Sequence, residues 1–440
     1  MKDKVTVVRE HILDLLESGT LQEGDKLPGA RELCDEVDAS FVMTQNALAS
    51  LVRDGILDSV SRRGTFVRQG WADRALGSNF VIYRNPAPWL GGLTEILSRR
   101  LPKLRISRHF SKSFFELRTT TTVQENRYDY MDLSGLLKKV YPDDSIFFTT
   151  PFRSFYTANG ALIGIPFIFS PRVMFYNPRL LTQAGCPLPV ANWVWDDFIG
   201  SIKTLKRTLP GNNIFNWDMM SFNWMNFVFR AGGTLIDPGA DDPVKIDDPR
   251  TRHGLKLHTE LRELLGRDDA RPTGDFAKGE LAFLLGPREL LCDFKHADFA
   301  DWRTVPLPLI PGGTELTTQA TDLICVRKDC TDMDVAHEFI KVMLSEETQD
   351  FIGSERFGIP IRKSSALKSI NFDDPCDALF MSEMSKMSAE YNLDSPELSM
   401  TVIDGIRQIW RRNADVEECT RELADAVRTF LKIKKSQNSQ

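Results

Sequence analysis

The hydrophobic positions of the first 70 residues are spaced for three short helices followed by a hairpin. Apolar side chains recur every three or four residues over 5–17, within the segment ARELCDEV, and again over about 41–54, which is the spacing that buries one face of a helix. Two short stretches, 56–60 and 65–67, then flank a basic turn and predict a pair of antiparallel strands.

Polar side chains that suit DNA contact lie at two places in this predicted domain, the start of the third helix and the tip of the hairpin. Ser40 precedes the third helix and is suited to cap it, because its hydroxyl can accept from an unpaired backbone N–H. Thr44, Gln45 and Asn46 are predicted to point outward, with groups of the kind that reach base edges in a DNA groove. The hairpin tip SRRG carries two arginines suited to phosphates or to a minor groove. The order of parts is that of a winged helix-turn-helix.

Residues 24–67 resemble the N-terminal domain of the GntR family of bacterial transcription regulators. The segments GDKLP, REL, GIL and GTFV occur in the order and spacing of that family, and the resemblance covers about residues 5–68. The resemblance implies a DNA-reading domain. Together with the polar positions above, it predicts the following DNA-contacting residues: Lys26, Arg31, Ser40, Thr44, Gln45, Asn46, Arg62, Arg63 and Gly64.

The sequence departs from the family pattern in ways that weaken the expected contact with DNA. Gly29-Ala30 stands where the family has Ser-Glu, and Phe41 stands where the family has an arginine. Residues 1–70 carry nine Lys/Arg against twelve Asp/Glu. The affinity for DNA falls with salt concentration, and each neutralised phosphate adds about one unit to the slope of log K against log salt. A DNA-reading domain (the reader) with few cations should therefore show a shallow salt slope. We therefore expect affinity to come from two paired readers; the alternative is a winged helix that has lost its DNA affinity.

Beyond a polar segment at 69–78, which we interpret as a linker, the pattern changes. Strand candidates at 79–83 and 104–110 are separated by a helix candidate at 91–101, in which Leu93, Ile96 and Leu97 fall together. Strands that alternate with helices predict a parallel sheet and an α/β architecture.

An ordered series of short segments follows along the rest of the chain. GIP at 164–166, FYN at 175–177 and WDDF at 195–198 resemble the extracellular solute-binding proteins of sugar importers, and the likeness extends over about 79–432. The resemblance implies a type II periplasmic-binding-protein-like fold that holds a ligand between two lobes. On that layout we place lobe one at about 79–176 and 304–362, and lobe two at about 177–303 and 363–435.

Sugar sites need aromatic faces and short polar side chains in a preformed cleft. Residues 215–227, FNWDMMSFNWMNF, are rich in both, although Trp224 could equally pack in a core. Arg288 could bind an acidic or phosphorylated sugar, or lie at the surface. Gln319 and Thr321 border the late strands. Our predicted ligand-binding residues are Trp89, Phe167, Trp217, Asp218, Asn223, Trp224, Arg288, Trp302 and Asp322.

Composition narrows the class of protein. A chain of 440 residues is long enough for several domains, and a net charge of −6 makes any DNA contact local. The seven cysteines are scattered and lack a C-x-x-C pair, so we expect free thiols in a reducing compartment. The sequence has no apolar run of membrane-spanning length and no signal-peptide pattern. It has no metal-binding, P-loop or nucleophile-elbow motif, so we predict no enzyme, metal or cofactor.

These observations predict a cytoplasmic, homodimeric, one-component transcription regulator that binds operator DNA. Its ligand is expected to be a mono- or oligosaccharide, and repression is the commoner sense in the DNA-binding family. Two alternatives stay open: a sugar-binding scaffold that does not bind DNA, and a transport solute-binding protein.

Overall fold

The computed structural model divides the chain into two compact units. Unit 1 comprises residues 1–118, 129–142 and 324–348, and unit 2 comprises residues 119–128, 143–323 and 349–440. The residues described are 4–71, 80–83, 87–102, 104–107, 113–157, 159–210, 213–266, 275–294, 299–389, 393 and 395–437. Most of the predicted linker (72–78), and the ends of two predicted strands at 79 and 108–110, lie outside these residues.

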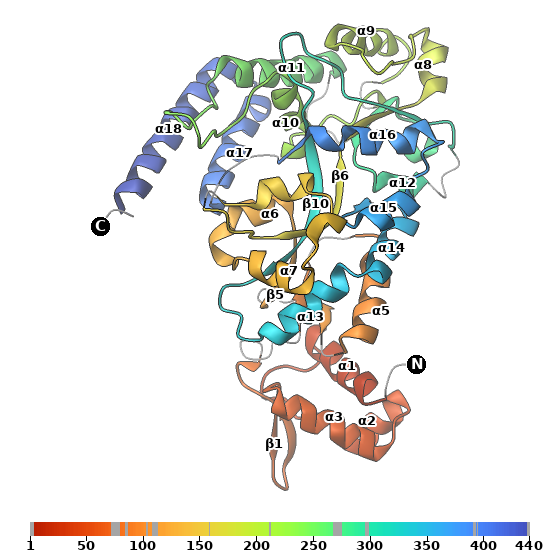
Figure 1. Ribbon diagram of the computed structural model, residues 1–440, viewed down its shortest axis with the longest axis vertical. Helices are drawn as coiled ribbons and strands as arrows, with labels where there is room; N and C mark the ends of the chain where they lie inside the picture. Colours follow the sequence, from red (N-terminus) through yellow and green to blue (C-terminus); the bar gives the residue numbers. More distant parts are fainter. Residues whose placement is uncertain are drawn as a thin grey trace. The chain divides into compact units, whose positions relative to one another are not determined.

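Three helices and a hairpin open unit 1, as the hydrophobic spacing predicts. They are α1 (Lys4–Glu17), α2 (Ala30–Val37), α3 (Phe41–Arg53), β1 (Leu57–Val60) and β2 (Gly64–Val67). The two strands pair antiparallel, and Figure 1 shows α2 and α3 next to each other with the hairpin extending beyond them. This is a winged helix-turn-helix.

Local signals in the sequence set the ends of these helices. The hydroxyl of Ser40 accepts from the backbone N–H of Met43 at 3.3 Å, which caps α3 as predicted. The second helix begins after Gly29, which has no side chain to act as a cap; instead the Gly29 N–H donates to the Glu32 carboxylate at 3.3 Å. The apolar faces then meet in one small core, which includes Val8, Ile12, Leu33, Leu48 and Leu51.

The rest of unit 1 is α/β. Strand β3 (Phe80–Ile82) pairs in parallel with β4 (Arg105–Ser107) and with β5 (Phe115–Thr119), and α5 (Leu90–Arg100) connects β3 to β4. The predicted parallel sheet is thereby confirmed. Two further helices of unit 1 are α7 (Ser134–Val140) and α13 (Met333–Met343).

Strand β10 (Thr317–Val326) passes from unit 2 into unit 1. Within unit 2, β6 (Ile165–Pro171) pairs antiparallel with β11 (Ile359–Pro360). A second sheet has β7 (Val173–Tyr176) between β8 (Phe283–Gly286) and β9 (Arg303–Val305). Strand β12 (Met387–Ser388) pairs in parallel with β10.

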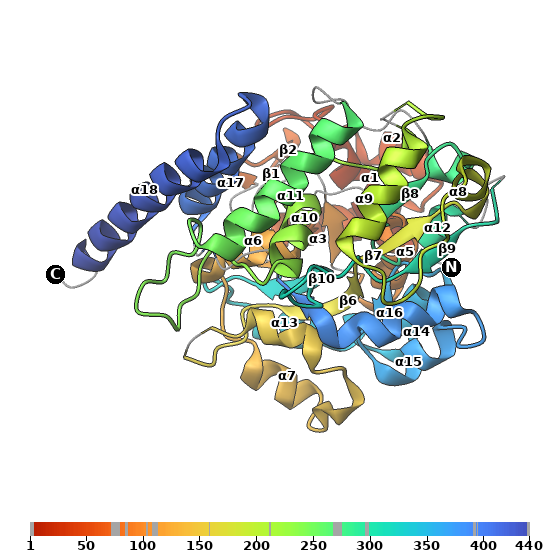
Figure 2. The ribbon, with the colours of Figure 1, turned by 90° about the horizontal axis from the view of Figure 1, so that it is seen from above.

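Helices cover the strands of unit 2. Figure 2 shows α10 (Ser221–Arg230) beside α11 (Pro249–Leu265), and α17 (Pro396–Arg411) beside α18 (Val416–Gln437). Gly254 permits close approach of the first pair, because a Cβ there would lie 2.4 Å from the Cα of Val228. Other α-helices of the described residues are α6 (Thr120–Glu125), α8 (Pro178–Ala184), α9 (Trp195–Leu205), α12 (Leu290–Phe294), α15 (Lys363–Ser369), α16 (Pro375–Glu383) and α14 (Glu346–Ser354), which begins in unit 1.

Among the residues described, no helix combines the length and the hydropathy that crossing a bilayer requires.

Candidate functional site

The exposed face of α3 carries both polar and apolar side chains. Gln45 and Asn46 are exposed, as predicted, and so are Phe41, Val42 and Met43 in the first turn. The buried face of α3 packs against the core of the domain, so this outer face is free to meet a partner. In helix-turn-helix proteins the N-terminal part of the corresponding helix contacts base edges.

Thr44 does not belong to that face, which corrects the prediction. Its side chain is buried, and its hydroxyl accepts from the Cys34 thiol at 3.3 Å. The physical reason is the helical period: Thr44 lies three, four and seven residues before Ala47, Leu48 and Leu51, which form the buried stripe.

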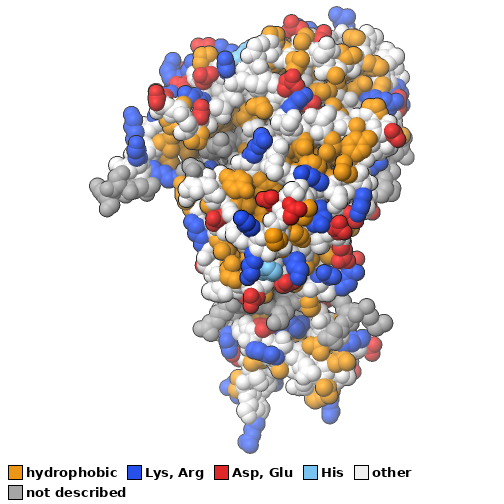
Figure 3. All heavy atoms as spheres, in the orientation of Figure 1, with side chains coloured by type: hydrophobic (Ala, Val, Ile, Leu, Met, Phe, Trp, Pro, Cys, Tyr) orange, Lys and Arg blue, Asp and Glu red, His pale blue; other side chains and the backbone are white. Residues whose placement is uncertain are grey.

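The hairpin presents cations at its tip. Arg62 and Arg63 are exposed, and Arg62 has a positive φ of 62°, which makes the turn tight. Gly64, with φ of 117°, begins β2, and a Cβ at this position would lie 2.9 Å from the Lys26 side chain. Glycine therefore lets the exposed Lys26 lie against the hairpin. Figure 3 shows Lys and Arg side chains at the hairpin tip.

Acidic side chains surround the other predicted contact. Arg31 is exposed in the first turn of α2, in the same helix as Glu32, Asp35 and Glu36. Glu36 pairs with His11 at 2.8 Å, a charged pair when that imidazole is protonated. The hairpin tip and Lys26 are therefore exposed cations that lie outside this acidic helix.

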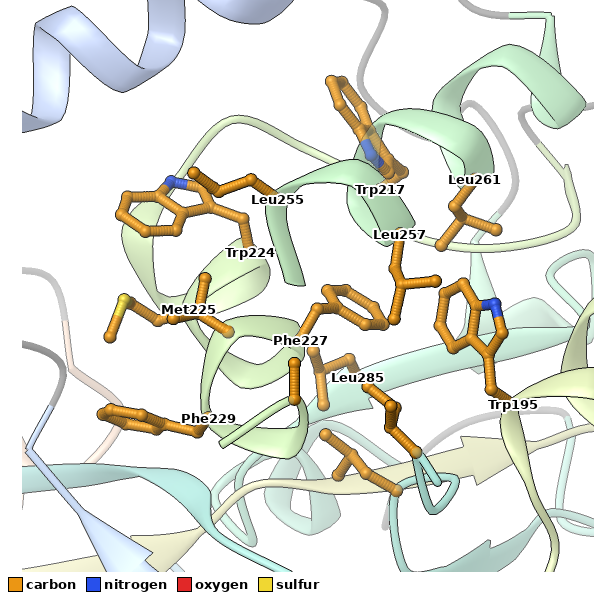
Figure 4. Packing of buried hydrophobic residues seen from close by; sticks show 14 of the residues in the cluster. Trp195, Trp217, Trp224, Met225, Phe227, Phe229, Leu255, Leu257, Leu261 and Leu285 are labelled. Atoms are coloured by element: carbon orange, nitrogen blue, oxygen red, sulfur yellow. The ribbon is translucent and has the colours of Figure 1, made fainter. Parts of the chain in front are cut away.

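The predicted ligand aromatics of unit 2 lie in its core. Trp217 is buried; its indole Nε1 donates to the carbonyl of His258 at 3.0 Å, and its ring stacks on the His258 imidazole with centroids 4.8 Å apart. Trp224 is fully buried and lies 6.0 Å from Trp410, centroid to centroid. Figure 4 shows Trp217, Trp224 and Phe227 in this cluster. The prediction that Trp217 and Trp224 face a ligand is wrong, because tertiary packing covers both rings.

The burial of this cluster also acts on His258. Desolvation lowers the pKa of its imidazole to about 3, and the hydrogen bond with the carbonyl of Asp218 only partly opposes this shift. The ring is therefore neutral at neutral pH. Asp218 is half-buried and accepts from the Met220 N–H at 2.6 Å through its carboxylate. Asn223 is buried and donates to the carbonyl of Asn216 at 2.8 Å.

Arg288 is a structural residue, which corrects its assignment as a ligand contact or a surface residue. Its guanidinium is fully buried and forms a two-pronged pair with Asp377, with Nε–Oδ1 at 2.7 Å and Nη2–Oδ2 at 3.0 Å. It also donates to the carbonyls of Gly358 at 2.7 Å and Ser369 at 3.1 Å. These partners, remote in sequence, occupy the donors that a ligand carboxylate would need.

The other predicted ligand residues divide by burial. Phe167, in β6, and Trp89, which contacts Tyr83, are buried in their units and do not present a face to solvent. Trp302 is half-buried against Phe175, with ring centroids 5.9 Å apart. Asp322 is half-buried on β10.

A polar run on β10 is more informative than the aromatic segment. Thr317 and Thr318 are buried and bond to Asn226, and Thr318 also accepts from Arg172 at 3.1 Å. Gln319 and Thr321, two residues apart on one face of the strand, are buried as well. Gln319 Nε2 and Thr321 Oγ1 have no hydrogen-bond partner within the described part of the chain.

Sequence reasoning missed Arg172, and it placed Asn226 in the aromatic segment 215–227 without linking it to β10. The available signal was the polar stretch TTQATD inside an otherwise apolar strand, which requires buried partners.

A cavity of 440 Å³ opens elsewhere on unit 2, and none of the predicted ligand residues lines it. Its wall includes Trp195, which starts α9, together with Lys203, His253 and Glu260. Trp195 packs edge-on against Phe198 and Phe227.

Arg105 links the winged helix to the α/β part of unit 1. Its Nη1 donates to the carbonyl of Glu10 at 3.0 Å, and its Nη2 pairs with Glu17 at 2.8 Å and with Asp14. Asp14 and Glu17 lie in the last turn of α1, where the helix dipole favours a cation. The Arg105 side chain is 20% exposed and that of Glu17 is 9% exposed, so water screens the contact only in part.

The class of protein now follows from these parts: a winged helix-turn-helix regulator joined to an α/β solute-binding domain. Residues 118–375 match the bacterial extracellular solute-binding protein family, and residues 4–67 match the gntR family of bacterial regulatory proteins. The chain belongs to the solute-binding protein family and carries a GntR regulatory domain at its N-terminus. The predicted recognition and fold class are confirmed, and both families are of non-enzymatic kinds.

The chain is also similar to individual proteins of both kinds. The chain is 35% identical over 69 residues to a probable fructoselysine utilization operon transcriptional repressor of Escherichia coli K12. The aligned region is 16% of this chain and 28% of that repressor. The structure of a maltose-bound T. maritima protein superposes on this chain with a TM-score of 0.64 and 16% sequence identity. The superposition covers 80% of this chain and 99% of the T. maritima chain. A Mycobacterium tuberculosis protein in complex with glycerophosphocholine has 15% identity and a TM-score of 0.68, covering 81% and 99%. The two structures establish the fold alone.

Proposed function

We propose that this protein is a ligand-responsive transcription regulator. Residues 1–68 act as the DNA reader, and residues 79–435 act as a sensor for a small carbohydrate. The family matches support the two halves of this proposal, because one chain carries a regulatory winged helix and a solute-binding domain. A DNA partner places the proposed activity in the cytoplasm.

The reader would approach the duplex with α3 in the major groove. Gln45 and Asn46 would then meet base edges, while Arg62 and Arg63 would meet phosphates or the minor groove. With so few cations, a single reader neutralises few phosphates. Two copies on a two-fold-related operator, each contributing one reader, would supply the missing affinity.

The sensor would bind its ligand through the polar face of β10. The buried Gln319 Nε2 and Thr321 Oγ1 are a donor and a hydroxyl without protein partners among the described residues, and a buried polar group left unpaired costs free energy. Hydroxyl groups of a carbohydrate would satisfy both. The maltose-bound relative supports a sugar, and the glycerophosphocholine-bound relative defines the competing class of ligand.

The Arg105 contact is the observation that carries the coupling. Arg105, in strand β4, donates to a carbonyl and pairs with two carboxylates of α1, the first helix of the DNA reader. A change in the sensor that moves β4 would therefore act directly on α1. A ligand that favours one of two such states shifts DNA occupancy by its differential affinity for them.

The test uses the full chain and the DNA upstream of its own gene. A thermal-shift panel that includes maltose, other neutral sugars and glycerophosphocholine first identifies a stabilising compound. Fluorescence anisotropy then measures the DNA Kd with and without that compound. We expect a complex at low salt and a Kd that changes when the sugar is added. No complex under any ligand condition would overturn the proposal.

A matched pair of variants tests the sensor site. Gln319→Leu should abolish the thermal stabilisation by the sugar, whereas Trp217→Phe should lower the melting temperature of the free protein and keep the increment due to the sugar. If Trp217→Phe abolished the stabilisation by the sugar and Gln319→Leu kept it, the binding site would lie in the aromatic segment 215–227.

A further inference from the structure

Three consecutive apolar side chains are exposed at the start of α3. Phe41 is 53% exposed, Val42 is 67% exposed and Met43 is 36% exposed. They form one cluster on the same helix as the exposed Gln45 and Asn46. Such clustered exposure of large apolar groups marks a surface that a partner covers.

The local structure fixes this cluster in place. The Ser40 hydroxyl caps α3, so the helix begins at Phe41. Ala47, Leu48 and Leu51 then turn into the core and leave the first turn facing solvent. The cluster therefore has a fixed position at the N-terminal end of α3. In helix-turn-helix proteins this part of the recognition helix contacts base edges.

The chemistry of α3 is unusual for a DNA reader. Its sequence, FVMTQNALASLVR, has no lysine or arginine before Arg53 in the last turn. The bidentate contact of a guanidinium with guanine is consequently absent from the first part of this helix. What remains is three apolar side chains, which suit the 5-methyl group of thymine, and two amides, which suit adenine N6 and N7.

We infer that this protein reads an A·T-rich half-site through thymine methyl groups, with Phe41, Val42 and Met43 as the methyl-contacting residues. Gln45 and Asn46 read the adenines of the same base pairs. The inference rests on the proposed DNA-binding function and adds the base composition of the operator and the residues that determine it.

Charge complementarity favours DNA as the occupant of the cluster. The exposed cations Arg62 and Arg63 belong to the hairpin of the same small domain, and the exposed Lys26 lies against that hairpin. This arrangement suits a polyanion next to α3. The domain is also the part of the chain that matches the regulatory family. A second copy of the chain is the alternative occupant, and the experiment below separates the two.

The test removes methyl groups from the DNA without altering its hydrogen-bonding edges. Footprinting of the full chain on its upstream DNA first locates the half-sites. Each thymine of one half-site is then replaced by uracil, and Kd is measured by anisotropy. We expect a weakening of about fourfold for each contacted methyl group, the factor that burial of one such group corresponds to. Uracil placed outside the half-site serves as the control and should leave Kd unchanged.

Protein variants assign the effect to the cluster. Phe41→Ala should weaken binding to the thymine site and lose most of the difference between thymine and uracil, whereas Gln45→Ala should weaken binding and keep that difference. Because Phe41 is largely exposed, circular dichroism should show an unchanged fold.

The outcomes separate this inference from the function on which it rests. Equal Kd values on thymine and uracil sites would overturn the inference and leave DNA binding intact. A Phe41→Ala variant that becomes monomeric in sedimentation, while its uracil effect persists, would assign the cluster to a second copy and also overturn it. Absence of any footprint would instead refute the proposed function.

Discussion

Removing Asp377 should strongly destabilise unit 2. Its carboxylate and the Arg288 guanidinium are both fully buried and joined by two hydrogen bonds of 2.7 Å and 3.0 Å. Among the described residues, the Asp377→Ala variant leaves the Arg288 guanidinium with the carbonyls of Gly358 and Ser369 as its partners. It also removes the acceptor of the Asn371 N–H. Breaking a buried pair from one side costs about 3–5 kcal/mol, because an uncompensated charge remains inside.

Urea unfolding measures this loss. Tryptophan fluorescence reports on unit 2, because Trp217, Trp224 and Trp410 pack together in its core. With a denaturant slope of about 1–3 kcal/mol per molar, we expect the midpoint to fall by about 1 M or more. The exposed pair Lys256–Glu417, whose side chains are 50% and 58% exposed, supplies the matched control. Glu417→Gln should leave the midpoint unchanged.

A double variant tests the mechanism. In a background of Arg288→Met, the change Asp377→Leu should cost far less than it does in the wild type, because the buried cation is already gone. A loss of less than about 1 kcal/mol on removing Asp377 alone would show that no uncompensated charge remains inside. So would equal costs of Asp377→Leu in the two backgrounds.

Three further predictions follow from other parts of the chain. Arg62→Ala with Arg63→Ala should reduce the salt slope of DNA binding by about two units per bound copy, as measured by anisotropy over a salt series; an unchanged slope would exclude phosphate contact. Arg105→Ala should keep both DNA and sugar binding but shrink the sugar-induced change in DNA Kd, whose usual range is about 5–150-fold, while the control Arg99→Ala keeps it. Because the pKa of His258 is lowered to about 3, its contribution to stability is complete above pH 6.5 and is lost as the pH falls toward 3, at up to about 1.4 kcal/mol per pH unit. His258→Phe should therefore flatten acid unfolding, and identical slopes for the two proteins would contradict the neutral buried ring.

The winged helix was predictable because its signals are local. Ser40 caps α3, and Gly19, with φ of 74°, follows the end of α1. Thr44 is the exception: its hydroxyl suits a DNA contact, but its position in the helical period places it in the buried stripe of α3. Where chemistry and periodicity disagree on a short helix, spacing is the better guide to burial.

The fold of the solute-binding domain was predictable from an ordered series of segments, whereas its ligand residues were not. Trp217 precedes a helix, α10, and its neighbours in space include Trp410, which lies far along the chain. Arg288 likewise finds its partner, Asp377, on a remote helix. No pattern in the local sequence distinguishes an aromatic or cationic side chain that meets a ligand from one that meets such a distant partner.

In the proposed function, one chain converts binding of a small carbohydrate into a change in DNA occupancy. Anisotropy of labelled upstream DNA, titrated with the full protein in the absence and presence of a stabilising sugar from the panel that includes maltose, tests it most directly. We expect a specific complex at low salt and a shift in Kd on addition of the sugar, which Gln319→Leu removes. A DNA Kd that is the same with and without a sugar known to bind the protein would contradict it.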